Sequence, residues 1–243
     1  VIWMKGTFLN PQYLQSQDLY LENTLQFHLG SLSYAPRGFR ELRVDHEALA
    51  AGYFSLAQAS GIFSDGLLFD IPNSDPGPAP KPLAEFFEPD QETMDIYLAV
   101  PHYRDRGLNV SLPASDADTR YLTDVAMLRD ENTGKTEKPV QVARKNFRFL
   151  VEGESRQTCS VLRVARVNKT PAGLFELDPA FVPPLLDFSA SDYLVAIARR
   201  LGRMGARVSI CARNSSKLDR AAADLRAAGI EGLAQQTDVT CAD

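Results

Sequence analysis

The chain has 243 residues, of which 44% are hydrophobic and 23% charged, a composition typical of soluble globular proteins with a sizeable core. Its formal net charge of -5 argues against nucleic acid as the main partner, because phosphate binding requires a surplus of Lys and Arg. No apolar run approaches the roughly twenty residues of a membrane span, no secretory signal is visible and no CxxC pair occurs, so we expect a cytoplasmic protein without direct membrane contact, zinc site or disulfide framework.

The first element that the sequence predicts is a helix from Pro11 through Gly30. Pro11 suits the first turn of a helix, where its missing N–H costs nothing. Leucines recur at helical spacing along one side of this segment: Leu14, Leu21, Leu25 and Leu29. The pattern indicates an amphipathic helix that packs on a core. A membrane-surface role is disfavoured, because the polar side lacks Lys and Arg.

After Gly38 the apolar period changes from helical to two. The alternating apolar residues are Leu42 with Val44, Leu67 with Phe69 and Ile71, Ile96 with Leu98 and Val100, Leu108 with Val110 and Leu112, Val140 with Val142, Phe147 with Phe149 and Val151, and Leu162 with Val164. Turn sequences such as Asp65-Gly66 and Glu152-Gly153 separate them. Roughly eight to ten such strands predict a mainly β fold, an antiparallel β-sandwich or barrel with an N-terminal helix.

Prolines mark two breaks in this pattern. Those at positions 72, 76, 78, 80 and 82 favour an extended surface connection over a proline-rich ligand for another domain. Pro183-Pro184 closes the β-rich region. Beyond it, Ser189 is the expected N-cap of a second helix, with Asp192 in the capping-box position. The apolar stripe of that helix is Leu194, Ile197, Leu201 and Met204.

The sequence predicts no catalytic set, metal site or cofactor. The three histidines, His28, His46 and His102, are isolated from one another. Asp65, Asp70 and Asp75 stand before Gly, Ile-Pro and Pro, which favours roles at turns and strand ends over an acid pair. Ser189 and Ser191 lie at a helix start without a nucleophile elbow, so helix capping is preferred to catalysis.

The segment WMKGTFLNPQYLQSQDLYLE (3–22) resembles the opening of the TssK family of type VI secretion baseplate proteins, also called the ImpJ/VasE family. That family has a Phe-Leu-x-Pro-Gln segment followed by a Gln-rich helix, and the chain departs from it at Tyr13, where the family often has His. Two more segments match in order: ELRVDHEALAAGYFSLAQASGIFSDGLLFDIP (41–72) and LLDFSASDYLVAIARRL (185–201). The resemblance covers about four-fifths of the chain.

The resemblance implies a non-enzymatic structural or adaptor protein. TssK proteins are trimers with an N-terminal β-sandwich shoulder, a helical neck and a C-terminal head, and the shoulder docks on the wedge proteins of the baseplate. We therefore expect self-association as a homotrimer and wedge proteins as partners. The expected contact residues are Phe8, Leu9, Pro11 and Gln12; the alternative is that the apolar ones simply seal the sandwich core. The head lies outside the resemblance, so docking on the membrane complex is not carried over.

The tail AIARRLGRMGARVSICARNSSKLDRAAADLRAAGIEGLAQQTDVT (196–240) resembles a short-chain dehydrogenase/reductase entered partway through, a partial Rossmann fold. The resemblance puts Arg213 where such enzymes select NADP, and Asp238 and Val239 where the adenine packs. Neither the TGxxxGxG turn that holds the pyrophosphate nor a Tyr-x-x-x-Lys pair is present, so these positions are vestigial and no cofactor is expected. The rival hypothesis is an inactive NADP-dependent oxidoreductase fragment.

Together these patterns predict three parts. Residues 1–186 form the shoulder-like β-sandwich domain, and residues 187–201 form a helix that contains the seam between the two resemblances. Residues 202–243 form a short α/β tail that lacks the first strand and glycine loop of a dehydrogenase. The sequence leaves open whether this fusion is a natural recombination, an assembly accident or a deliberate chimera.

Overall fold

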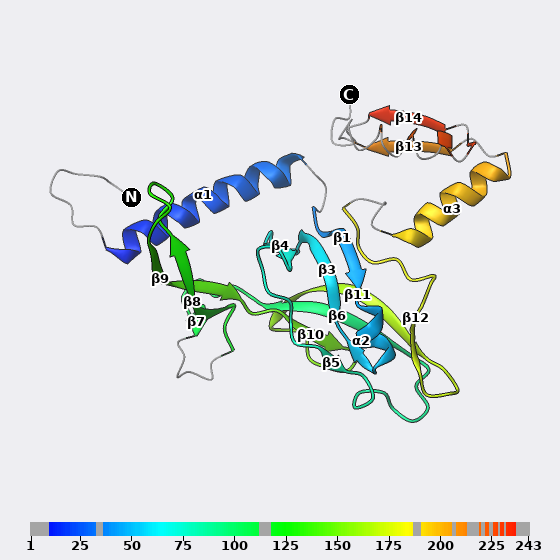
Figure 1. Ribbon diagram of the computed structural model, residues 1–243, viewed down its shortest axis with the longest axis horizontal. Helices are drawn as coiled ribbons and strands as arrows, with labels where there is room; N and C mark the ends of the chain where they lie inside the picture. Colours follow the sequence, from blue (N-terminus) through cyan, green and yellow to red (C-terminus); the bar gives the residue numbers. More distant parts are fainter. Residues whose placement is uncertain are drawn as a thin grey trace. The chain divides into compact units, whose positions relative to one another are not determined.

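The computed structural model describes residues 10–32, 36–111, 118–186, 191–205 and 208–212, and in the tail residues 219, 222–223, 226–227, 229–230 and 232–236. The chain divides into two compact units, Arg37–Ala198 and Val1–Pro36 with Arg199–Asp243. The first unit holds all the strands from β1 to β12 (Figure 1). The expectation of a mainly β fold with antiparallel sheets and an N-terminal helix is confirmed.

The first sheet has three antiparallel strands in the order β1-β3-β4. Its strands are β1 (Gly38–Val44), β3 (Leu56–Ile62) and β4 (Leu68–Ile71). Two short elements lie between or beside them: helix α2 (His46–Ala50), which Asp45 caps through its side chain, and the two-residue strand β2 (Tyr53–Phe54), which pairs with β5 (Lys81–Pro82). The predicted turn at Asp65 joins β3 to β4, and the Leu67 N–H donates to the Asp65 carboxylate.

The second sheet has four antiparallel strands in the order β10-β6-β11-β12. Its strands are β6 (Thr93–Pro101), β10 (Arg148–Val151), β11 (Cys159–Lys169) and β12 (Phe175–Leu177). β6 is the central strand, and its side chains are buried on both faces of the sheet. Met94, Ile96, Leu98 and Val100 face the main core, whereas Ala99 belongs to a small second cluster with Leu150 and Cys159.

One hydrophobic core is shared by these two sheets. The first sheet contributes Phe39, Ala59, Phe69 and Ile71, and the second contributes the apolar face of β6 together with Phe149, Val151, Leu162, Val164 and Val167. The Phe69 ring is the centre of an aromatic group, with centroid distances of 5.7 Å to Phe39, 5.1 Å to Phe63 and 6.2 Å to Phe147. Because Phe69 lies on β4 and Phe147 directly precedes β10, these rings tie one sheet to the other.

The strand predicted around Leu108, Val110 and Leu112 begins later than expected. Strand β7 (Val110–Ser111) begins at Val110, the Leu108 side chain before it is exposed, and Leu112 lies outside the described residues. The reason is the side chain of Asn109, which accepts a hydrogen bond from the Arg104 N–H and donates one to the Arg104 carbonyl, both at 2.8 Å. Such local side-chain bonds hold a loop where the apolar alternation alone predicts a strand.

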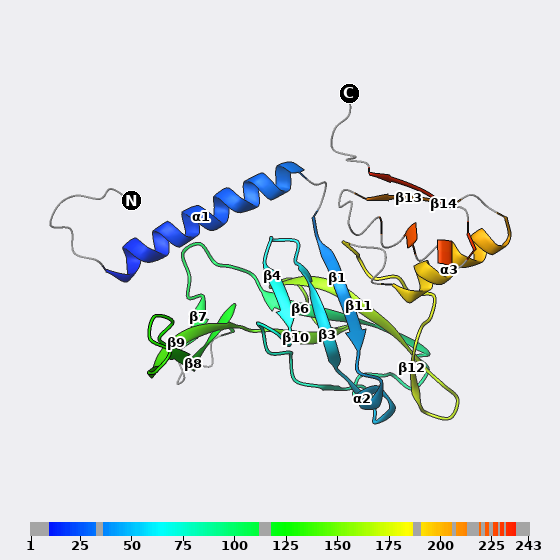
Figure 2. The same ribbon diagram turned by 45° about the horizontal axis from the view of Figure 1, so that its top comes forward.

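A third sheet, β7-β8-β9, projects from one end of the two-sheet unit, as Figure 2 shows. Strands β8 (Tyr121–Arg129) and β9 (Glu137–Lys145) form a long antiparallel hairpin, whereas β7 pairs with β8 in parallel. No side chain described in β8 or β9 is buried, in contrast to β6 and β11. A hairpin with both faces open needs a partner surface to be stable, because an isolated pair of strands is marginal in water.

Helix α1 (Pro11–Leu32) contains the predicted helix and begins at Pro11 as expected. Asn10 precedes it and accepts a hydrogen bond from the Tyr13 N–H at 3.0 Å, as an N-cap does. Apart from Tyr13 and Thr24, every side chain of the helix with a described environment is exposed, including Leu14, Leu21 and Leu25. The packing of this helix on a core stays a prediction, because the helix and the β-rich unit belong to different compact units. The apolar spacing correctly predicted a helix, but spacing alone does not reveal which molecule covers its apolar side.

Helix α3 (Asp192–Arg203) follows the β-rich unit. Among the residues that the structure describes, Ser191 caps it, since the Leu194 N–H donates to the Ser191 hydroxyl at 3.4 Å; the predicted cap Ser189 lies outside them. Strands β13 (Val208–Ala212) and β14 (Gly232–Gln236) then pair in parallel, close to the two strands predicted for the tail. Gly202 lies against Ile230, and a β-carbon at this position would clash with that side chain.

The segments that enter and leave the β-rich unit lie side by side at Gly38. The Phe39 N–H donates to the Pro184 carbonyl and the Leu186 N–H donates to the Phe39 carbonyl, each at 2.8 Å. Gly38 has φ = +131°, and a β-carbon added there would lie 2.6 Å from the Pro184 carbonyl oxygen. Only glycine fits this position, because both the backbone angle and the space exclude a side chain.

Replacing Gly38 with Ala should therefore lower the free energy of unfolding by more than about 1 kcal/mol. Gly134→Ala is the matched control, since Gly134 also has a positive φ (+63°) but nothing within 4 Å of the added β-carbon. Urea denaturation of both variants separates the strain of the backbone from the loss of the Pro184 contact. Equal destabilisation by the two substitutions would contradict the close approach of the two segments.

Candidate protein-interaction site

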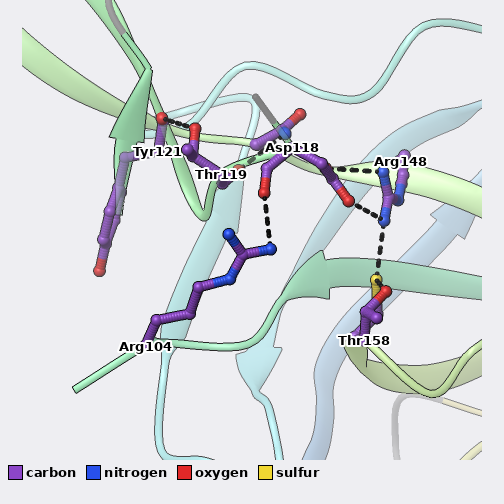
Figure 3. Close-up of polar contacts among 8 residues, drawn as sticks. Arg104, Asp118, Thr119, Tyr121, Arg148 and Thr158 are labelled. Atoms are coloured by element: carbon purple, nitrogen blue, oxygen red, sulfur yellow. Dashed lines mark hydrogen bonds and ion pairs between the residues drawn. The ribbon is translucent and has the colours of Figure 1, made fainter. Parts of the chain in front are cut away.

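A network of polar side chains lies at the root of the β8–β9 hairpin (Figure 3). The Nη1 and Nη2 atoms of Arg148 donate to the two carboxylate oxygens of Asp118 at 2.9 and 3.0 Å. The same Nη2 atom donates to Cys159 Sγ at 2.9 Å, and Arg104 donates to the Asp118 carbonyl at 3.2 Å. Because the Arg148 guanidinium binds both oxygens of the Asp118 carboxylate, the pair fixes the orientation of the two side chains as well as their distance. Asp118 precedes the hairpin and Arg148 follows it, so the pair closes the hairpin at its root.

Arg120 forms the buried part of this root. Its side chain is 5% exposed, and Nη1 donates to Asp65 Oδ2 and to the Pro101 carbonyl, both at 2.8 Å. The Ser160 hydroxyl donates to the same Asp65 oxygen at 2.7 Å. Burial alone would raise the pKa of Asp65, but the hydrogen bonds from Arg120 and Ser160 and the charge of Arg120 outweigh it, so the pKa lies below its usual value. Asp65 is therefore a charged anchor between the sheets and the hairpin.

Asp65, His102 and Ser160 have the composition of a hydrolase triad but not its geometry. In a triad the carboxylate orients the histidine, which in turn takes the proton of the serine. Here the serine hydroxyl donates to the carboxylate itself, and His102 Nδ1 lies 3.2 Å from Ser160 Oγ. Ser160 is buried, so a substrate carbonyl could not reach its oxygen. The cluster is an anchor for Arg120 and not a nucleophile.

Backbone and amide contacts complete the root on both strands. The Asn146 N–H donates to the Arg120 carbonyl and its side chain donates to the Thr119 carbonyl, both at 2.9 Å. The Thr123 hydroxyl donates to the Ser111 carbonyl at 2.7 Å, which ties β8 to β7. The hairpin is therefore held at a fixed angle to the two sheets, as an arm whose surface is presented to other molecules.

The two faces of this arm differ in character. The strand register places Leu122, Ala126, Leu128, Val140 and Val142 on one face, which we call the leucine face. Leu122, Leu128 and Val140 are 39–50% exposed. The opposite face carries Val125, Met127 and Pro139. Exposed apolar side chains grouped on an open sheet are typical of protein-binding surfaces.

The residues predicted from the sequence as partner contacts belong to the N-terminal end of the chain, and their role stays a prediction. Pro11 and Gln12 are the first two residues of α1 and both are exposed, whereas Phe8 and Leu9 lie outside the described residues. Arg213, Asp238 and Val239, which the sequence analysis interpreted as vestigial dehydrogenase positions, also lie outside them. The hairpin root was missed, because its members are separated by tens of residues and only the strand topology brings them together.

A second charged cluster lies at Asp95 on the four-stranded sheet. Arg163 Nη1 donates to Asp95 Oδ2 at 2.8 Å and Arg166 Nε donates to Asp95 Oδ1 at 2.9 Å. Burial would raise the pKa of Asp95, but the hydrogen bonds from Arg166 and Arg163 and their charges outweigh it, so its pKa lies below the usual value. The cluster joins β6 to β11 by charged side chains on neighbouring strands.

This cluster should make the free energy of unfolding depend on pH in the acidic range. Because the pKa of Asp95 is lower in the folded chain than in the unfolded one, its contribution is complete above about pH 4 and is lost as the pH falls through the folded value. Asp95→Asn should therefore lower the urea midpoint at pH 7 and leave a smaller further drop between pH 5 and pH 3 than the parent chain shows. An unchanged pH dependence would contradict the assignment.

Within the described ranges, no group of His, Cys, Asp and Glu side chains could hold a metal ion. The same residues include no helix that is both long and apolar enough to span a bilayer. The described residues do form a hairpin arm with exposed apolar side chains on both faces and a helix, α1, whose leucines are exposed. Features of this kind are typical of proteins that bind other proteins.

Comparison with known sequences places the chain in a family of that class. A profile described as "Bacterial Type VI secretion, VC_A0110, EvfL, ImpJ, VasE" matches residues 13–230, so the chain belongs to the TssK/VasE family. The type VI secretion system baseplate component TssK1 of Pseudomonas aeruginosa is 33% identical over 205 residues. The match covers 83% of this chain and 45% of that protein, so the chain spans about half the length of this relative.

Solved structures show the same fold. A crystal structure of TssK is similar with a TM-score of 0.74 and 28% identity, covering 84% of this chain and 46% of the other. TssK in a TssK-TssF-TssG baseplate subcomplex gives a TM-score of 0.77 at 24% identity, covering 84% and 67%. A chain of the type VI baseplate complex gives 0.76 at 22%, covering 98% and 50%. The resemblance inferred from Trp3 to Glu22 and the two later segments thus led to the correct family.

These comparisons give no support to a dehydrogenase fragment. The family profile runs through residue 230, well past the predicted seam at 187–201. The parallel pair β13–β14 by itself does not distinguish the two interpretations, because parallel strands joined by a helical crossover occur in many unrelated folds. The alternative function as an NADP-dependent oxidoreductase is accordingly unsupported.

Proposed function

We propose that this chain is a non-enzymatic structural component of the type VI secretion baseplate, which acts through self-association as a homotrimer and through docking on wedge proteins. The observation that carries the proposal is the arm at β7-β8-β9, whose root is locked by Arg120 and Arg148 while its apolar faces stay open. A clamped arm favours a scaffold, because rigid presentation lowers the entropy lost on binding. Family membership supplies the assembly in which the arm would act.

The proposal includes the domain arrangement. The two sheets with their shared core would be the β-sandwich of the shoulder domain, residues 1–186, and residues 187–201 the helical segment that follows it. Its partners would be proteins of the TssF and TssG kind, since a relative of similar fold was solved in a TssK-TssF-TssG subcomplex. Phe8, Leu9, Pro11 and Gln12 remain the proposed contact residues at the N-terminal end, and a cytoplasmic site of assembly is part of the same proposal.

The test is capture of the wedge together with the mass in solution. The chain, carrying an affinity tag, is mixed with a purified TssF–TssG complex from a type VI system, and its own mass is measured by light scattering over a range of concentrations. Co-elution with the wedge and a mass that rises to three copies are the expected results. A strict monomer that fails to retain TssF–TssG would overturn the proposal. Saturable NADPH binding that Arg213→Ala abolishes would instead revive the oxidoreductase alternative.

A further inference from the structure

Two apolar surfaces, one in each of the two compact units, carry exposed leucines. One is the leucine face of the hairpin. The other lies on α1, where Leu14, Leu21 and Leu25 are 51–62% exposed. These three side chains fall at i, i+7 and i+11, so they form one stripe along the helix, which we call the leucine stripe. A helix with such a stripe is stabilised mainly by packing it against another element.

We propose that the leucine stripe of α1 in one copy packs on the leucine face of the hairpin in a second copy. This inference rests on the self-association proposed above and names the surfaces that produce it. The contact joins two different surfaces, so each copy binds one neighbour through its leucine stripe and the other through its leucine face. Contacts of this head-to-tail type close into a ring when the rotation between copies permits it, which is the arrangement a trimer requires.

The two surfaces match in length. The leucine stripe runs from Leu14 to Leu25, about 17 Å at 1.5 Å per residue. The leucine face runs from Leu122 to Leu128, about 20 Å at 3.4 Å per residue. The helix can therefore lie along the hairpin with its apolar side chains in register with those of the sheet.

The two surfaces also match in charge. Helix α1 carries Asp18 and Glu22 but no Lys or Arg, and helical geometry places both acids beside the leucine stripe. On the leucine face, Asp124 is paired with Arg144, whereas Lys138 lies directly across the strand pair from Leu128. Lys138 forms no ion pair with any other described residue. An acidic helix edge thus meets an available cation on the arm.

Matched substitutions on the two faces of the hairpin test which face takes part in self-association. Leu128→Ser should weaken self-association about tenfold or more, because it removes a leucine from the interface. Met127→Ser is the control: Met127 is the adjacent residue of the same strand, is 58% exposed and lies on the opposite face, so its loss should leave the association constant unchanged. Both are measured by sedimentation of the full chain. Equal weakening by the two variants would overturn the assignment.

The charge match has its own test. Lys138→Glu should weaken self-association about threefold or more at low salt, and adding Glu22→Lys should restore it because the two charges exchange places. Lys135→Glu, in the turn that joins β8 to β9, is the matched control and should have no effect. Failure of Glu22→Lys to rescue the first variant would overturn the pairing of these surfaces.

A cross-link distinguishes a second copy from the same chain. In a background of Cys211→Ser and Cys241→Ser, one batch carries Leu21→Cys and another Leu128→Cys, and the two are mixed and oxidised. A disulfide between the two batches is the expected result. Cross-linking only within a chain that carries both substitutions would show that α1 covers its own hairpin and would contradict the proposal. If the chain forms trimers but no cross-link appears, the proposed function stands and this interface is wrong.

Discussion

Replacing Asp65 with Ala should lower the free energy of unfolding by about 3–5 kcal/mol, one of the two largest effects we expect from a single substitution. The substitution leaves the guanidinium of Arg120 buried with only the Pro101 carbonyl as a partner at Nη1. It also removes the acceptor of the Ser160 hydroxyl. Urea denaturation followed by far-UV circular dichroism gives the change directly.

Two controls show whether the buried charge is the cause. Asp124→Ala removes a carboxylate from an exposed Asp–Arg pair with Arg144 and should cost at most about 1 kcal/mol. The double variant Asp65→Ala with Arg120→Met should recover most of the lost stability, because no unpaired charge remains in the interior. If the double variant is as unstable as Asp65→Ala alone, the anchoring role of Arg120 is wrong.

Replacing Phe69 with Ala should lower the free energy of unfolding by a similar amount, about 3–5 kcal/mol. The side chain is 3% exposed and contacts the rings of Phe39, Phe63 and Phe147, so its removal leaves a cavity between the two sheets. The unfolding enthalpy from calorimetry and the urea midpoint should both fall.

Phe27→Ala in α1 is the matched control for this cavity. It deletes the same side chain at a site that is 73% exposed, and in dilute solution it should change stability by less than about 0.5 kcal/mol. A large loss of stability in the dilute monomer would contradict the exposure of the Phe27 side chain.

Much of the fold was predictable from local patterns. The period-two alternation around Leu98 and Leu162 correctly indicated strands, and the leucine spacing after Pro11 correctly indicated a helix. These patterns allow a prediction because the spacing of apolar residues along the sequence matches the period of the helix or strand that places them on one face. Where local polar bonds compete with the alternation, as at Asn109, the strand begins later than predicted.

The candidate interaction site was much harder to predict. The pairing of Arg120 with Asp65 joins residues 55 positions apart, and the network of Arg148 with Cys159 lies on the neighbouring sheet. Nothing in the local sequence signals that a particular arginine is buried. The exposure of the two hairpin faces could not be predicted either. Leu122, Val140 and Val142 follow the same alternation as residues of a buried strand.

In the tail, local patterns suggested a family that the comparisons do not support. The sequence predicts a helix, a strand, another helix and a second strand there, with Gly229 and Gly232 at their boundaries, and this order suggested a dehydrogenase fragment. The TssK/VasE family profile, however, continues to residue 230. Local order of this kind specifies elements and their direction but not the family to which they belong.

The adjacency of Gly38 and Pro184 has a consequence for evolution. Because the points of entry and departure of the β-rich unit are joined by two backbone hydrogen bonds, the unit can be spliced between other segments without stretching either neighbour. The segments before and after such a unit can be exchanged in evolution while its core stays the same. Relatives with different appended helices would then share this closure even where their loops diverge.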